Sequence, residues 1–93
     1  PTAVLEAPAN VALGASFTLD GSRSFDIGGQ ITEYRWTVGA RPVAVTSDPT
    51  FTVVVNAAQP LAVGTHVMQL VVVDDSGNES SATMASVQVV DAS

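Results

Sequence analysis

The chain contains no cysteine and no lysine, and only 13% of its residues are charged. Without cysteine, disulfides, thiolate-held zinc, iron–sulfur clusters and thiol catalysis are excluded. The redox compartment stays open, because a chain without thiols suits oxidising and reducing surroundings alike. Three arginines against nine acidic residues give a net charge of −6. Since nucleic acids and anionic membranes require a basic surface, neither is an expected partner.

Long hydrophobic runs are missing as well. Residues 49–73 carry no charged side chain, but asparagine, glutamine, proline, glycine and histidine interrupt them. A membrane-spanning helix needs about 20 consecutive apolar residues. We therefore expect no membrane insertion.

What the chain does contain is typical of β-structure. Hydrophobic residues make up 46% of its 93 residues, and sixteen of these are valines, while serine and threonine contribute nine each. β-Branched residues are enriched in strands. The length is that of one domain, so we interpret residues 1–93 as a single module.

Turn-forming pairs such as Asp20-Gly21, Gly28-Gly29 and Asp48-Pro49 separate short apolar segments. Strands are expected at residues 3–5, 15–19, 32–38, 42–46, 50–55, 65–74 and 81–90. The segment 42–46 is expected at a sheet edge, where proline is tolerated. Helix is nearly absent, and only residues 53–63 could contain a turn, around residues 56–59. Seven short strands with a lone tryptophan on the third predict an all-β fold, an immunoglobulin-like two-sheet antiparallel β-sandwich.

Alternation along the expected strands identifies the core, because successive side chains of a strand point to opposite faces. The inward set comprises Phe17, Leu19, Tyr34, Trp36, Met68, Leu70 and Val72. On the last strand the core candidates are Met84, Val87 and either Val89 or Val90.

Four stretches resemble the PKD (polycystic kidney disease) domain family. Residues 19–26 read L-D-G-S-R-S-F-D and are similar to its D-G-S-x-S-x-D loop. Residues 29–36 resemble its G-x-I-x-x-Y-x-W strand. Residues 64–74 resemble its long G-x-Y-x-V-x-L-x-V-x-D strand, and residues 75–77 resemble the turn that follows.

The sequence departs from this pattern in two places. Thr37 follows the tryptophan where the commonest members have D-F-G-D-G, which resembles the receptor-type and REJ-like relatives. His66 stands at the usual tyrosine of the long strand. A tyrosine hydroxyl there would bond a backbone group, and the histidine is expected to replace that bond less securely.

The resemblance also suggests a calcium site, since some PKD-like domains bind calcium through loop aspartates and an aspartate after the long strand. Here the candidates are Asp26, Asp74 and Asp75. Gly28 takes the place of the second loop aspartate, so one carboxylate is missing. Calcium takes six to eight oxygen ligands, and each lost carboxylate weakens such a site. The alternative is that the three aspartates only shape turns by bonding their own backbone.

The sequence gives little support for catalysis or for sugar binding, and we predict no enzyme activity. His66 is the single histidine and falls within a predicted strand, away from any nucleophile pattern. Sugar-binding surfaces commonly stack exposed aromatic rings on sugars. In this chain Phe17, Tyr34 and Trp36 are assigned to the core, and only Phe25 and Phe51 remain. The loop at residues 39–49, with its edge strand, is the favoured place for a protein partner.

These observations predict a non-catalytic, extracellular or cell-surface module of a larger protein, acting as a spacer and protein-interaction domain. The resemblance implies neighbouring domains of the same chain as partners, with another surface protein or a glycan as further possibilities. One alternative is a carbohydrate- or protein-ligand-binding module appended to a secreted hydrolase. Another is a phage or virion surface decoration.

Overall fold

Alternating apolar and polar residues form seven strands in the computed structural model, which describes residues 1–55 and 60–91. The strands are β1 (Asn10–Ala12), β2 (Phe17–Asp20), β3 (Ile31–Val38), β4 (Arg41–Thr46), β5 (Thr50–Val53), β6 (Gly64–Asp74) and β7 (Thr83–Val90). Among the described residues there is no helix suited to crossing a membrane. The turn that residues 53–63 could contain would centre on residues 56–59, which lie outside the described residues.

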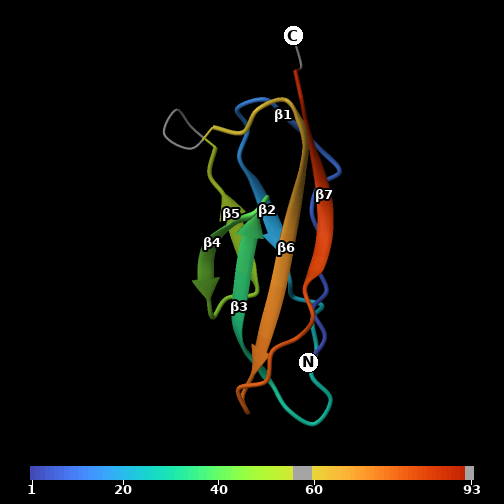
Figure 1. Ribbon diagram of the computed structural model, residues 1–93, viewed down its shortest axis with the longest axis vertical. Coiled ribbons are helices and arrows are strands. Elements are labelled where there is room, and N and C mark those ends of the chain that lie inside the picture. Colours follow the sequence, from blue (N-terminus) through green and yellow to red (C-terminus); the bar gives the residue numbers. More distant parts are fainter. Residues whose placement is uncertain (56–59, 92–93) are drawn as a thin grey trace.

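The strands form two sheets, as Figure 1 shows. The larger sheet has the order β1-β7-β6-β3-β4, and the smaller sheet pairs β2 with β5. The predicted all-β sandwich is confirmed. All strand pairs but one are antiparallel. The exception is β1, which runs parallel to β7, with Asn10 opposite Gln88 and Ala12 opposite Val90.

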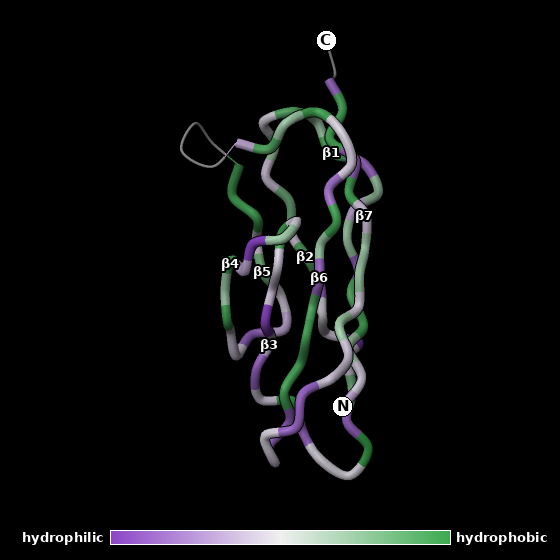
Figure 2. The backbone as a smooth tube through the Cα atoms, viewed as in Figure 1, coloured by the Kyte–Doolittle hydropathy of each residue, from purple (hydrophilic) through white to green (hydrophobic). Residues whose placement is uncertain are grey.

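The core lies between the sheets. All seven side chains named from the alternation are buried there, together with Val53 and Val87. Val73 and Val89 are buried as well. Trp36, Leu19 and Leu70 have no exposed surface at all. Figure 2 shows apolar stretches along the strands and a hydrophilic end where β6 leaves the sheet.

Trp36 sits at the centre of an aromatic stack. Its ring lies 6.0 Å from that of Phe51 and 6.1 Å from that of Tyr34, with small interplanar angles. Its indole nitrogen donates a hydrogen bond of 2.8 Å to the Thr46 hydroxyl, which in turn donates to the Asp48 carbonyl. The buried N–H is therefore satisfied, as a buried polar group requires.

The N-terminal part of the chain differs from the prediction. The expected first strand at residues 3–5 is absent, and only isolated bridges join Thr2 to Phe25 and Glu6 to Asp20. The first regular strand is instead Asn10–Ala12. Its ladder partner is the last strand, so no local pattern of the sequence could indicate it.

The last strand also needs a correction. Met84, expected in the core, is 65% exposed because it faces Gln69 on the outer side of the large sheet. The inward positions are those of Val87 and Val89, which are buried. The segment expected at the edge is indeed the edge strand β4 of the large sheet.

Candidate functional site

The three candidate calcium ligands come from two distant parts of the chain. Asp74 ends β6, Asp75 follows it, and Asp26 lies in the loop before β3. One carboxylate oxygen from each residue lies within 4.8 Å of the other two. Asp74 is buried, Asp26 is half-buried and Asp75 is exposed. The fold thus gathers these residues into one acidic cluster, at the hydrophilic end of the molecule in Figure 2.

Asp74 is held rigidly by the turn that follows β6. Its Oδ1 accepts hydrogen bonds from the backbone N–H groups of Asn78, at 2.8 Å, and Ser76, at 2.9 Å. The bond from the Asn78 backbone is the largest cause that lowers the pKa of Asp74, and burial opposes it. Asp74 is therefore a charged turn-former, whether or not a cation is bound.

Two glycines shape the space around the cluster. A Cβ on Gly29 would stand 2.8 Å from Oδ1 of Asp75 and still closer to Oδ2 of Asp26. Glycine at this position lets the carboxylates approach the backbone. Gly28 has a φ of 85° and open space around it, so its backbone conformation, rather than crowding, favours glycine.

The cluster suits a hard cation in donor type and spacing. Calcium binds carboxylate oxygens at about 2.3–2.6 Å, so two ligands on opposite sides of it lie about 5 Å apart. The observed 4.8 Å limit is within that span. Asp26, Asp74 and Asp75 would supply three ligands, and carbonyl or water oxygens would have to complete the shell.

The D-G-S-x-S motif has structural roles beside this cluster. The carboxylate of Asp20 accepts a hydrogen bond from the Ser22 backbone. Gly21 is buried, and its N–H donates to the Pro49 carbonyl at 2.7 Å. The Ser24 hydroxyl bonds both backbone groups of Val4 and fixes the N-terminal segment where a strand was expected.

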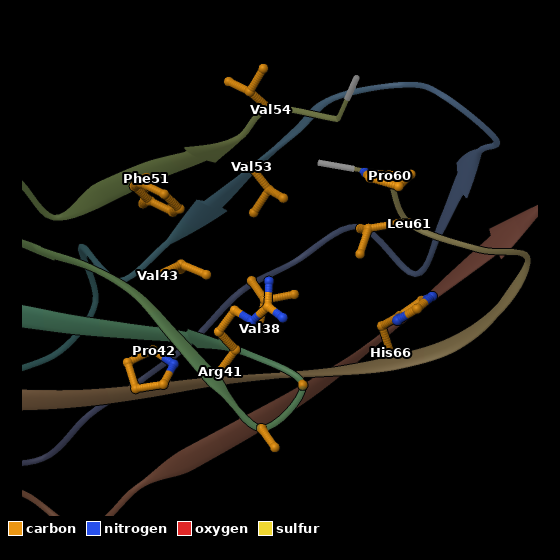
Figure 3. A pocket seen from close by; sticks show the side chains of 12 residues that line it. Val38, Arg41, Pro42, Val43, Phe51, Val53, Val54, Pro60, Leu61 and His66 are labelled. Atoms are coloured by element: carbon orange, nitrogen blue, oxygen red, sulfur yellow. The ribbon is translucent and has the colours of Figure 1, made fainter. Parts of the chain in front are cut away.

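A second feature is a groove of about 830 Å³ between the two sheets. Its lining comes from the end of β3, the turn that follows, the start of β4, β5 with the residue after it, the segment before β6, and β6 itself. The principal side chains are Arg41, Val43, Phe51, Val53, Leu61 and His66. Figure 3 shows the Arg41 side chain extending into the middle of this group.

The sequence indicated only part of the groove. The loop 39–49 was favoured as a contact surface, and Arg41 belongs to it. Phe51, Leu61 and His66 join it through tertiary packing, for which no sequence signal existed. The ring of His66 makes a hydrogen bond of 2.8 Å to the Ala62 carbonyl. The histidine at the usual tyrosine position therefore does bond a backbone group.

Comparison with known proteins agrees with this architecture. Residues 7–89 match the family described as K319L-like, PKD domain. The chain belongs to this PKD domain family. No curated protein sequence matches it.

Two solved structures resemble this PKD domain closely in fold. One belongs to work on the structural basis for the promiscuous specificity of the carbohydrate-binding modules from the β-sandwich superfamily. It shares 25% identity with a TM-score of 0.82, covering 99% of this chain and 35% of that one. The other comes from the fibronectin(III)-like modules of Clostridium thermocellum CbhA. It has 20% identity and a TM-score of 0.76, covering 98% of this chain and 47% of that one. The PKD domain thus spans less than half of each of these two structures.

Proposed function

We propose that this PKD domain is a non-catalytic, load-bearing spacer within a longer extracellular protein. The observation that carries the proposal is the parallel pairing of β1 with β7. In Figure 1 the chain leaves β7 at one end of the molecule, while the segment preceding β1 leads toward the opposite half. The domain is elongated, with a longest dimension of 49 Å against 22 and 19 Å for the others.

This arrangement determines how tension would act. Pulling the N-terminal segment away from the end of β7 slides β1 along β7 in shear. The hydrogen bonds between the two strands are then loaded together, so they cannot open one after another. Two of them are the bond from Gln88 N–H to the Ala9 carbonyl, at 2.9 Å, and that from Leu13 N–H to the Val90 carbonyl, at 2.8 Å.

The comparisons support a non-catalytic role, because the matched structures are named as binding or fibronectin-like modules. The extracellular placement and the neighbouring domains as partners follow from family membership and are part of the proposal. His66, the single histidine of the chain, bonds the Ala62 backbone, and within residues 1–55 and 60–91 it forms no ion pair with a carboxylate.

Leu13→Pro is expected to weaken resistance to force more than it weakens the fold. Proline lacks the N–H that bonds Val90, while the Leu13 side chain is exposed and contributes little to the core. One such bond contributes about 0.5–1.5 kcal/mol. Single-molecule force spectroscopy on the domain between identical reference domains should show a lower unfolding force. Leu13→Ala, which keeps the N–H, is the control. Equal forces for the two variants would exclude β1–β7 as the load-bearing element.

A second candidate function, calcium binding that stiffens one end of the spacer, is favoured by the acidic cluster. Three carboxylates held within 4.8 Å repel each other, and a divalent cation would relieve that repulsion. Binding to the folded state alone would raise the free energy of unfolding by about 2.7 kcal/mol at a calcium concentration 100 times the Kd.

Adding calcium to the chelator-treated domain should raise its melting temperature and shift the amide NMR signals of Asp26, Gly29 and Asp75 saturably. Asp26→Asn should abolish both effects, because it removes one charged ligand while keeping the side-chain shape. Asp48→Asn serves as the control, since that exposed aspartate is not a member of the cluster. If no saturable shift occurs at millimolar calcium, the aspartates are turn-formers alone.

The alternative of a sugar-binding module receives less support from the side chains. The rings of Phe17, Tyr34 and Trp36 are buried, and Phe51 is half-buried against Trp36. Phe25 is half-exposed, but within the described residues no second exposed aromatic ring accompanies it. An aromatic platform for stacking sugars is therefore not formed by residues 1–55 and 60–91.

A further inference from the structure

The groove between the sheets has a charge opposite to that of the molecule as a whole. Two of the three arginines are neutralised: Arg23 by Glu6, and Arg35 by Glu33 and Glu79. Across residues 1–55 and 60–91, no carboxylate lies within ion-pair distance of Arg41, and no acidic residue lines the groove. In a chain of net charge −6, this is a local site of attraction for a carboxylate.

The remainder of the groove is mainly aliphatic. Val43 and Val54 are 40% and 52% exposed on its walls, and Leu61 and Pro60 close one side. Figure 3 shows Val53 and Leu61 directed toward the space that Arg41 enters, while Val54 points away from it. Aliphatic walls suit valine-like side chains, because burying them gains free energy roughly in proportion to the apolar area.

A free sheet edge borders the groove. In the described part of the chain β5 pairs only with β2, so its other edge has no strand partner. The edge of β4 is less suited to strand addition, because Pro42 has no N–H and the ladder with β3 shifts register between Trp36 and Thr37. An incoming strand would therefore pair with β5.

From these three features we propose that the groove binds an extended polypeptide segment with β-branched residues flanking one acidic side chain. Its backbone pairs with the free edge of β5, its apolar side chains contact Val43 and Leu61, and its carboxylate pairs with Arg41. Backbone pairing at an exposed sheet edge is an established mode of peptide recognition. This inference is independent of the load-bearing role, since it concerns β4 and β5 and not the ladder between β1 and β7.

The test uses two synthetic peptides, acetyl-SVTVEVS-amide and the same peptide with glutamine in place of glutamate. Each is titrated into the isotope-labelled domain, and the affinity is taken from amide NMR shifts. The glutamate peptide should shift the signals of Arg41, Val54 and Leu61, and the glutamine peptide should bind at least tenfold more weakly. Arg41→Gln should remove that difference. Arg23→Gln should keep it, because it changes the net charge equally but lies outside the groove.

Three results would overturn the proposal. Equal affinities of the two peptides would show that the carboxylate is not recognised. Equal losses in Arg41→Gln and Arg23→Gln would show that only the overall charge matters. Binding of a galacturonate trisaccharide in the groove, with no peptide binding, would assign the groove to acidic sugars instead. None of these outcomes bears on the unfolding force of the β1–β7 pair.

Discussion

Replacing Trp36 with alanine is expected to lower the free energy of unfolding by about 3–5 kcal/mol, the usual cost of truncating a buried tryptophan. The side chain has no exposed surface and stacks between Tyr34 and Phe51. Its loss also leaves the Thr46 hydroxyl without its donor. Because a small domain has only about 5–15 kcal/mol of stability, this single change removes a large share of it.

Urea denaturation followed by circular dichroism measures this effect without relying on tryptophan fluorescence. Thr46→Val is the matched control, since it removes the hydrogen bond to the indole and keeps the ring. It should cost about 1–3 kcal/mol, because the buried N–H then lacks an acceptor. A loss below about 1 kcal/mol in Trp36→Ala would mean that the aromatic stack is not the centre of the core.

Gly21→Ala is expected to destabilise the domain by about 1–3 kcal/mol, the usual cost of overpacking a core. A Cβ at Gly21 would lie 2.8 Å from Cδ2 of Leu70 and 3.2 Å from the ring of Trp36. A smaller effect acts in the other direction, because alanine restricts the unfolded chain and commonly gains about 0.4–1 kcal/mol. Since Leu70 and Trp36 are fully buried and cannot move aside, the steric cost should exceed that gain.

The same substitution made in a Leu70→Val background distinguishes this mechanism from a backbone effect. Valine has no δ carbon, so the close contact is removed and Gly21→Ala should cost less there. Thermal unfolding of the four proteins of this cycle gives the coupling energy. If the effects of the two substitutions on the free energy of unfolding simply add, contact with Leu70 does not exclude a side chain at position 21.

Local sequence patterns predicted the sandwich and its core because burial is encoded by alternation within each strand. Trp36 and Leu70 follow this rule, and both are buried. Met84 does not follow the prediction, because its strand carries apolar residues on both faces and the alternation could be read in either phase. The strand at 10–12 could not be predicted, since its partner lies at the other end of the chain.

The acidic cluster and the groove also differ in how far the sequence predicted them. Asp26, Asp74 and Asp75 were named through a family resemblance, and the fold gathers their carboxylates. The groove at Arg41 depends on packing between elements that share no motif. Its position therefore emerges only from the tertiary structure.

The parallel β1–β7 ladder also has a consequence during synthesis. Asn10 leaves the ribosome well before its partner Gln88, which is far along the chain. Until β7 emerges, β1 has no ladder to join, and the edge of β6 that β7 will cover stays open. Such late, long-range pairing slows folding and exposes strand edges to neighbouring nascent chains. Within residues 1–16 the only strand is β1, and proline stands at positions 1 and 8. Because proline lacks an N–H, this segment is poorly suited to pair with other strands before β7 is available.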